Sequence, residues 1–449
     1  MDLAHAPGDG GHVTAAGPTG FLGLSHLGIV SGVGWASFGE PVVAVDPDAA
    51  VVERLAAGDP PVREPGLPEL LAAAREQLTF TADLARLGEC PLVVVARDVP
   101  TDADNRSDLG PVLALLDAAV PHLRQDVVLA LMSQVPPGFT RELAARIRSA
   151  RPDLAFALYY WVETLIFGDA VRRVLQPERL IVGCADPAAP LPPAFQAGLA
   201  RLGCPILQMG YESAELTKTA INLYLIGAVT YSNTLADLCE AIGADWSEIV
   251  PALRLDARIG PAAYLRPSLG IAGGNLERDL ATLGRLAATH NVTAPYLDAL
   301  AAANADRFGW VGRKLEEHVF RDRARPTLGV WGLTYKKDTR STKNSPALRL
   351  LADLEGRADV RAWDPAVGAA DLPDALLIGA EIVASRDAVV AGADALLVMA
   401  DWDDFAAADL VLLRRTMRRP LVIDCVGVLE RRRHEMAGIE YISMGRLAT

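Results

Sequence analysis

Two polar residues with catalytic potential lie four positions apart in an otherwise apolar stretch of the chain. Lys218 and Asn222 belong to residues 211–244, YESAELTKTAINLYLIGAVTYSNTLADLCEAIGA, in which apolar residues recur at helical spacing. On a helix, residues four apart project from one face, about one turn from each other. A cation and an amide placed in this way can stabilise a negatively charged oxygen during a reaction. The alternative is a solvated lysine beside an ordinary helical asparagine.

A glycine-rich turn near the N-terminus indicates a nucleotide site. GLSHLG, residues 23–28, stands where the fingerprint G-x-G-x-x-G would stand, between a short apolar strand and a helix. A second strand at residues 42–45 then leads to Asp46, at the spacing of an acid that holds a ribose 2′-hydroxyl. We expect Asp46 to favour NAD over NADP, because it would repel a 2′-phosphate. The other expected cofactor contacts in this segment are Gly23, Ser25, Leu27 and Gly28.

Further strands place polar residues at the same edge of a predicted parallel sheet. The strands expected at residues 91–96 and 127–132 end in the turns RDVPTD and SQVPPG, which contain Thr101 and Gln134. Ligands of open α/β sheets bind at the carboxyl ends of the strands. We therefore add Thr101 and Gln134 to the expected cofactor contacts.

A second α/β pattern begins near residue 326, with strand-like runs in TLGVWGLTYKK, VRAWDP, ADALLVMADWDDF and RPLVIDC. The chain is therefore expected to be an α/β protein with two Rossmann-like, doubly wound parallel-sheet domains joined by a long central helix. The expected boundaries are a disordered tail at 1–16, an NAD-binding domain at 17–210, a central helical dimerisation domain at 211–320 and a C-terminal Rossmann-like domain at 321–449.

Bulk properties exclude several classes of function. The 449 residues carry a formal net charge of −13, which argues against a nucleic-acid surface and gives no support for a membrane partner. A phosphate-bearing ligand must then be held by local groups. The five cysteines have no CxxC spacing, so neither a zinc site nor a disulfide framework is indicated, and we expect no metal. The N-terminus lacks the basic region of a signal peptide, and a cytoplasmic protein is expected.

The chain resembles the UDP-glucose/GDP-mannose dehydrogenase family nearly end to end. Ten segments in order carry the resemblance, among them GLSHLG with AVDPD, REPGLPELL, SQVPPG, ESAELTKTAINLYL, GIAGGNLERDL and WGLTYKKDT with NSPAL. The resemblance implies an NAD-dependent homodimer that oxidises the C6 alcohol of a nucleotide sugar, with the central helix in the dimer core.

The resemblance also assigns roles to individual residues. The positions that match the family's reacting centre are Glu163, Lys218, Asn222, Asn275 and Asp279. The positions expected to bind the substrate are Tyr264, Gly270, Gly273 and Lys336. Lys218 and Asn222 match the residues that contact the reacting C6 oxygen, and Asp279 is expected to accept a proton, directly or through a water.

Departures from the family pattern change the expected reaction. Asn275 stands where the family has its catalytic cysteine, Gln134 where it has a threonine, Phe167 where it has a second glutamate and Val426 where it has an arginine. An amide cannot add to an aldehyde as a thiolate does. The expected activity is therefore a single two-electron oxidation of a nucleotide sugar that leaves an aldehyde or ketone. The alternatives are a redox-neutral epimerase or isomerase with tightly held NAD, a non-catalytic binding subunit, and full oxidation through an aldehyde hydrate.

Overall fold

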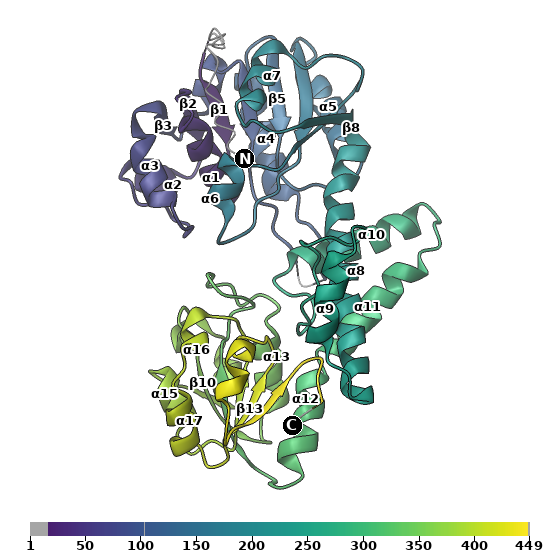
Figure 1. Cartoon of the computed structure of the whole chain (residues 1–449). Coiled ribbons are helices and arrows are strands. Elements are labelled where there is room, and N and C mark those ends of the chain that lie inside the picture. The colour runs from purple at the N-terminus through teal and green to yellow at the C-terminus, as the bar shows by residue number, and fades with distance from the viewer. Residues whose placement is uncertain (1–16, 103, 448–449) are drawn as a thin grey trace, which may run out of the picture. The chain divides into compact units, whose positions relative to one another are not determined.

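The computed structural model describes residues 17–102 and 104–447, so the tail expected at residues 1–16 lies outside the described part. The chain divides into two compact units (Figure 1). One comprises residues up to Asp102 together with Ser107–Lys218, and the other comprises Ala103–Arg106 and Thr219–Thr449.

The first unit is built on an eight-stranded sheet in the order β3-β2-β1-β4-β5-β6-β7-β8. All neighbouring strands are parallel except β6 and β7, which are antiparallel. The first six follow the order of a doubly wound dinucleotide fold, with its switch point between β1 and β4. The strands are β1 Thr19–Leu22, β2 Val42–Val45, β3 Leu78–Thr81, β4 Leu92–Val95, β5 Val127–Leu131, β6 Phe156–Trp161, β7 Leu180–Cys184 and β8 Ile206–Gly210.

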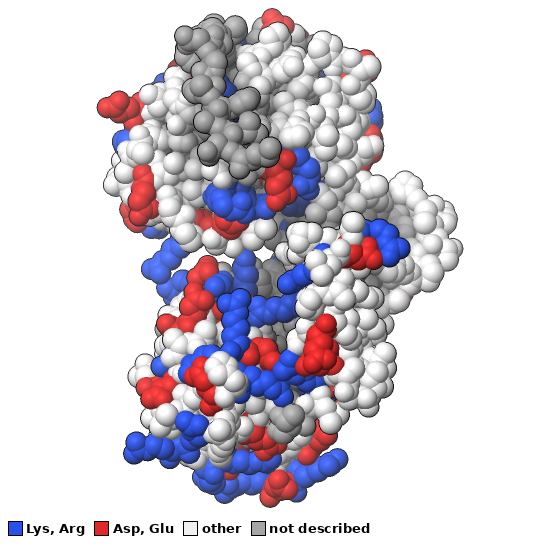
Figure 2. Space-filling model, viewed as in Figure 1, with Lys and Arg blue, Asp and Glu red and all other residues white. Residues whose placement is uncertain are grey.

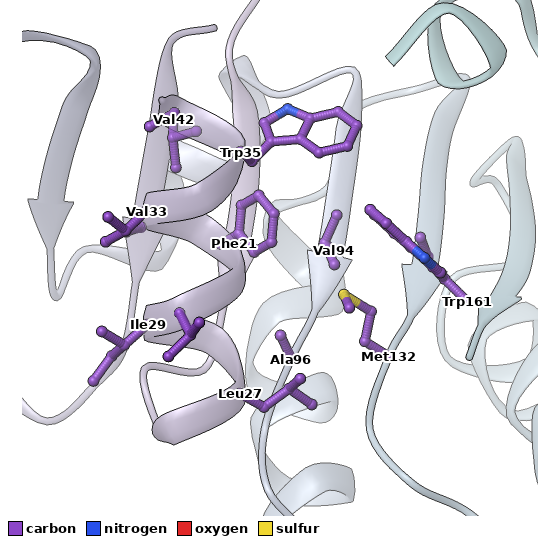
Figure 3. Packing of buried hydrophobic residues seen from close by; sticks show 14 of the residues in the cluster. Phe21, Leu27, Ile29, Val33, Trp35, Val42, Val94, Ala96, Met132 and Trp161 are labelled. Carbon is purple, nitrogen blue, oxygen red and sulfur yellow. The ribbon is translucent and has the colours of Figure 1, made fainter. Parts of the chain in front are cut away.

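Apolar side chains on strands and helices fix the layers of this unit. Its α-helices are α1 His26–Ala36, α2 Ala49–Ala56, α3 Leu67–Ala73, α4 Gly110–Ala119, α5 Phe139–Ala150, α6 Ala170–Leu175 and α7 Pro193–Ala200. Helix α1 is almost entirely buried, and its Trp35 packs between Phe21 of β1 and Trp161 of β6 (Figure 3). This packing holds the N-terminus of α1 at the carboxyl edge of β1, where a nucleotide site is expected.

One long helix, α8 Tyr211–Ile242, leads out of the first unit and into the second. The predicted helix ran two residues further, to Ala244. The helix ends at Ile242, and Gly243 follows with a φ of +77°, a left-handed conformation that glycine adopts without strain. The N–H of Ala244 then donates to the carbonyl of Cys239 at 3.0 Å and satisfies one of the last helical carbonyls.

The second unit continues with helices and ends in a six-stranded, all-parallel sheet in the order β11-β10-β9-β12-β13-β14. This repeats the strand order of the first six strands of the first unit. The first helices are α9 Trp246–Leu255, α10 Asn275–Thr289, α11 Pro295–Arg307 and α12 Trp310–Leu315. The strands are β9 Thr327–Trp331, β10 Asp359–Trp363, β11 Ala380–Ile382, β12 Ala395–Val398, β13 Leu421–Asp424 and β14 Glu440–Ser443. The helices among them are α13 Pro346–Asp353, α14 Asp374–Leu377, α15 Arg386–Val390, α16 Asp403–Ala406 and α17 Leu410–Thr416.

The predicted fold class is therefore confirmed: two Rossmann-like sheets joined through a long helix. The division of residues 211–449 into two separate domains stays a prediction. Within the described residues, no helix is both long and apolar enough to cross a membrane.

Candidate functional site

The turn between β1 and α1 has the shape that a dinucleotide requires. Helix α1 approaches β1 so closely that a Cβ on Gly28 would lie 1.7 Å from the carbonyl oxygen of Gly23, so no other residue fits at position 28. Ser25 stands at the N-cap of α1, but its side chain makes no capping bond to the helix. The first N–H groups of α1 therefore need an acceptor other than the Ser25 side chain.

A carboxylate of the protein itself already accepts a hydrogen bond from one of these N–H groups. The carboxylate of Asp98, which follows β4, accepts a hydrogen bond from the N–H of Leu27 at 3.1 Å. The N–H of Asp98 in turn donates to Ser25 Oγ at 2.8 Å. The contact with Leu27 shows that the N–H groups at the start of α1 can bind a carboxylate. The residues present therefore fit a dinucleotide.

Asp46 lies directly after β2, as predicted, and is 1% exposed. Its carboxylate accepts hydrogen bonds from the N–H of Leu24 at 2.7 Å and of Asp48 at 3.0 Å. It also pairs with the guanidinium of Arg97 at 3.0 Å. The contact of Asp46 with a ribose stays a prediction, and Arg97 balances the charge of its carboxylate. The expected repulsion of a 2′-phosphate is correspondingly weakened.

His26, the first residue of α1, is held from two sides. Its Nε2 is hydrogen-bonded to Glu64 at 2.7 Å, and its ring lies against that of Phe167 with centroids 4.3 Å apart. Burial raises the pKa of Glu64, but the bonds from His26 and from the N–H groups of Gly168 and Ala170 outweigh it and hold the pKa below its usual value. Phe167, which replaces a family glutamate, therefore packs against the cofactor turn.

The two remaining expected cofactor contacts lie at the carboxyl edge of the sheet. Thr101 forms an isolated β-bridge with Ser107, and Gln134 is half-buried three residues after β5. Their contact with a cofactor stays a prediction.

Glu163 and Lys218 form a close ion pair within the first unit. The ammonium of Lys218 lies 2.6 Å from Glu163 Oε1 and also donates to the backbone carbonyl of Glu163 at 3.0 Å. The two side chains are only 12% and 13% exposed. Glu163 follows β6 and accepts a further bond from the N–H of Leu165 at 2.8 Å. The pair fixes Lys218 in one orientation on α8.

Asn222 and Asp279 form a second pair, within the second unit. The amide of Asn222 donates to Asp279 Oδ2 at 2.5 Å, and Arg278 Nε lies 3.2 Å from Asp279 Oδ1. Asp279 and Arg278 are 2% and 4% exposed, so the two side chains form a buried ion pair. Asn275 is the exposed first residue of α10, one helical turn before Asp279. The predicted helical relation between positions 275 and 279 is confirmed.

A glycine-rich loop precedes α10 and contains the other predicted substrate contacts. A Cβ on Gly273 would lie 2.5 Å from the ring of Tyr335, so this loop packs directly on the segment after β9. Lys336 lies in that segment, with Nζ 5.7 Å from the ring centroid of Tyr335. Tyr264, at the start of the loop, is 51% exposed. Gly273 and Lys336 thus both lie next to Tyr335 in the second unit.

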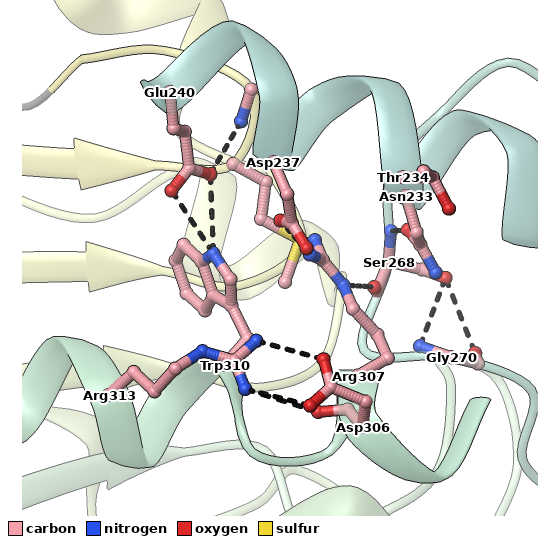
Figure 4. Close-up of polar contacts among 12 residues, drawn as sticks. Asn233, Thr234, Asp237, Glu240, Ser268, Gly270, Asp306, Arg307, Trp310 and Arg313 are labelled. Atoms are coloured by element: carbon pink, nitrogen blue, oxygen red, sulfur yellow. Dashed lines mark hydrogen bonds and ion pairs between the residues drawn. The ribbon is translucent and has the colours of Figure 1, made fainter. Parts of the chain in front are cut away.

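Buried polar contacts hold the loop in place (Figure 4). Arg307 of α11 is 2% exposed, pairs with Asp237 of α8 and donates to the carbonyl of Ser268 at 2.7 Å. Asn233 of α8 accepts a bond from the N–H of Ser268 at 2.8 Å, and Asn304 accepts one from Ile271 at 2.8 Å. Helices α8 and α11 therefore fix the loop from both sides.

The second unit also has a cavity of about 360 Å³ with a cationic lining. Arg254, Arg266 and Arg446 line it together with Trp246, Val426 and Glu430. Arg266 donates to the backbone carbonyl of Val426, the position at which the family has an arginine. The guanidinium of Arg266 therefore lies beside the backbone of Val426. On the visible face of this unit, Lys and Arg side chains are numerous and interspersed with acids, despite the net charge of −13 (Figure 2).

Several residues in these sites were not singled out from the sequence. Arg97 and Asp98 lie in a turn that was expected to meet a ligand, but their partners are 51 and 71 residues away in the chain. Arg278 could have been found as the basic neighbour of Asp279. Glu64 lies in the REPGLPELL segment and had no assigned role. No cluster of three or more His, Cys, Asp or Glu that could hold a metal lies within residues 17–102 and 104–447.

Three family models match consecutive parts of the chain. They describe the NAD binding domain, the central domain and the UDP binding domain of the UDP-glucose/GDP-mannose dehydrogenase family, and they match residues 19–192, 212–306 and 329–431. The chain belongs to this family. The NAD binding domain covers strands β1 to β7 of the first sheet, the glycine turn and Asp46.

Relatives span nearly the whole length of this family member. A UDP-glucose 6-dehydrogenase of Pseudomonas aeruginosa is 32% identical over 95% of this chain and 96% of its own. One of Rhizobium meliloti is 29% identical over 95% of this chain and 98% of its own. The solved structure of a UDP-glucose dehydrogenase from Pyrobaculum islandicum is 25% identical, covers 98% of this chain and 100% of its own, and has a TM-score of 0.85.

Proposed function

We propose that this protein is an NAD-dependent oxidoreductase that oxidises a hydroxyl group of a nucleotide-linked sugar and stops after one two-electron step. The observation that supports it most strongly is the buried pair of Asn222 and Asp279, one helical turn along α8 from the Lys218–Glu163 pair. These groups are retained, whereas the nucleophile of the family is replaced by Asn275.

The cofactor is NAD, which accepts the hydride when bound. The turn of residues 23–28 with the N–H of Leu27 would hold its phosphates, and Asp46 would hold its ribose. For the substrate, Arg254 and Arg266 of the cavity and the side chain of Lys336 would offer local positive charge to a diphosphate, whereas Arg446 is already paired with Asp245 and Glu430. We keep the base and the sugar open, because no described contact distinguishes among nucleotide sugars.

The retained side chains can stabilise the oxygen that loses its proton. An amide has two N–H groups, and Asn222 uses one of them toward Asp279. The other, together with the ammonium of Lys218, would hold the substrate oxygen as negative charge develops on it. Asp279 orients Asn222 and would accept the proton directly or through a water.

A second oxidation lacks its nucleophile. A thiolate would have to add to the aldehyde before a second hydride could leave, and Asn275 cannot do so. All five cysteines lie within the described residues, and burial raises the pKa of each of these thiols. None of them offers a thiolate in place of the missing one.

We also propose a cytoplasmic homodimer with α8 at the subunit interface. All five cysteines are free thiols, as a reducing compartment would keep them. Tyr224, Tyr231 and Leu238 of α8 are 73%, 47% and 51% exposed and follow one another in steps of seven. Apolar residues at that spacing form a stripe along one side of a helix, as paired helices require.

Incubation of the protein with NAD and a panel of nucleotide sugars tests the proposal. NADH absorbance should rise with at least one sugar, and the product mass should fall by two hydrogens. Lys218→Met should lower kcat by about a hundredfold or more, because it removes the cation that stabilises the negatively charged substrate oxygen. NAD affinity should stay unchanged, because Lys218 is not expected to contact the cofactor. Unchanged product mass with exchanged carbon-bound hydrogen would instead indicate an epimerase. Binding without any turnover would indicate a non-catalytic subunit.

A further inference from the structure

Two consecutive residues after β4 contact both groups that the first unit offers to a dinucleotide. Arg97 pairs with Asp46, the expected ribose acceptor, at 3.0 Å. Asp98 accepts the hydrogen bond of the Leu27 N–H, the expected phosphate donor, at 3.1 Å. Arg97 and Asp98 thus bind both of the groups that are expected to bind the cofactor.

The position of this dipeptide is fixed by its backbone. The N–H of Arg97 donates to Ser133 Oγ at 3.1 Å, and the N–H of Asp98 donates to Ser25 Oγ at 2.8 Å. These bonds tie the segment to the start of α1 and to the end of β5. The side chain of Asp98 is nevertheless exposed, so its carboxylate can rotate away without moving the backbone.

The Asp98 carboxylate and a phosphate of the dinucleotide would both bind to the N–H of Leu27. Helix α1 has 11 residues and no acidic residue in its own first turn. Its N-terminus attracts two acids from elsewhere in the chain: Glu64 contacts the side chain of His26, and Asp98 binds the N–H of Leu27 directly. A pyrophosphate bound to the N–H of Leu27 would lie within a few ångströms of that carboxylate. At such a distance two anions repel each other, and one of them must leave.

We propose that Asp98 is a built-in competitor for the phosphate position of the dinucleotide. NAD binds only after the Asp98 carboxylate has rotated away from the N–H of Leu27. Asp98 therefore lowers the affinity for the cofactor and takes no part in the chemistry. This inference rests on the proposed use of NAD, and it names the residue that sets how tightly NAD is held.

Calorimetric titration of the full-length protein with NAD and with ADP-ribose tests the inference without requiring turnover. Asp98→Asn keeps the size of the side chain and removes its charge, and Asp98→Ala removes the carboxylate entirely. We expect both variants to bind both ligands at least tenfold more tightly than the natural protein, with Asp98→Ala showing the larger effect. Asp59→Asn is the matched control, because it removes an exposed acid of the same unit that pairs with Arg54. Its affinities should stay unchanged.

The outcomes separate the inference from the proposed function. Unchanged or weaker binding in both Asp98 variants, with NADH formation intact in the natural protein, overturns the inference and leaves the function standing. Tighter ADP-ribose binding in the variants without any sugar oxidation supports the inference and contradicts the function. If the natural protein and all variants fail to bind either ligand, both ideas are overturned.

Discussion

The start of α10 holds an amide and two carboxylates in three different environments. Asn275 is exposed, Glu277 is half-buried and Asp279 is buried. Asp279 is bound by Asn222 and Arg278, whereas Glu277 accepts bonds from the N–H of Gly274 at 3.0 Å and from Asn344 at 2.7 Å. The start of the helix thus combines a side chain open to a substrate with two that hold the surrounding loops.

Asn275→Cys tests whether the nucleophile is what limits the reaction. A thiol at the N-terminus of a helix has a lowered pKa and can add to an aldehyde. We expect the variant to form some acid product and more than one NADH per sugar, or to trap a thioester that mass spectrometry detects. Asn275→Ser is the control, because a hydroxyl of similar size should give neither product. If Asn275→Cys gives no acid and no adduct while the first oxidation persists, the reacting carbon does not lie near position 275.

Glu277 should make stability depend on pH. Burial raises its pKa above the usual 4.5, against the opposing effects of Asn344, Gly274 and Lys343. The folded protein then holds the proton to higher pH than the unfolded chain, so stability falls as pH rises from about 4.5 through the folded pKa. Glu277→Gln should flatten this fall in a series of melting temperatures. The exposed Glu53 of α2 provides the control, since Glu53→Gln should keep the natural slope. A slope that Glu277→Gln leaves unaltered would contradict this assignment.

At the residue scale, the sequence predicted the placement of those side chains that depends only on local spacing, while their roles stay predictions. Lys218 and Asn222 required only a helix, and positions 275 and 279 required only that α10 begin where it does. The pairing of Arg97 with Asp46 and of Asp98 with Leu27 depends on how β1, β2 and β4 lie side by side. No local pattern contains that information.

At the element scale, Glu215 anchors the start of α8 to helix α5. Its carboxylate is fully buried and accepts bonds from the N–H groups of Gly138 at 2.6 Å and Thr140 at 2.7 Å. Gly138 is the N-cap of α5 and has no side chain, so Glu215 supplies the acceptor that a capping residue would supply. The helix that carries Lys218 is thereby fixed to the sheet of the first unit.

Removing this anchor should destabilise the first unit. Glu215→Ala leaves two buried N–H groups unsatisfied and should lower the free energy of unfolding by about 3 kcal/mol. Glu215→Gln keeps one acceptor oxygen and should cost less than half as much. Urea titration followed by tryptophan fluorescence measures both, because Trp35 and Trp161 lie in the core of this unit. Equal costs for the two variants would indicate that the carboxylate does not cap α5.

The elements were predicted more accurately than their ends. The strand at Val42–Val45 was predicted residue for residue, because a run of four buried apolar residues is bounded by Pro41 and Asp46. The end of α8 was missed by two residues, because apolar spacing continues past the glycine that stops the helix. The antiparallel pairing of β6 with β7 was also not predicted, since strand direction depends on the path of the connection and not on composition.

At the scale of the whole molecule, the exposed stripe on α8 should form the dimer interface. Leu238→Glu places a charge in that stripe and should convert a dimer into a monomer in sedimentation at micromolar concentration. Val411→Glu is the control, because Val411 is also 51% exposed but lies on α17, outside the stripe. A natural protein that sediments as a monomer would contradict the proposed interface, as would a Leu238→Glu variant that remains a dimer.

The most direct test of the account counts NADH molecules per molecule of sugar consumed, with the product identified by mass. The account predicts one NADH per sugar and a product that has lost two hydrogens, because Lys218, Asn222 and Asp279 are in place and Asn275 cannot add to the aldehyde. Two NADH per sugar and a product that has gained an oxygen would contradict it, since the complete oxidation would then proceed without the missing nucleophile.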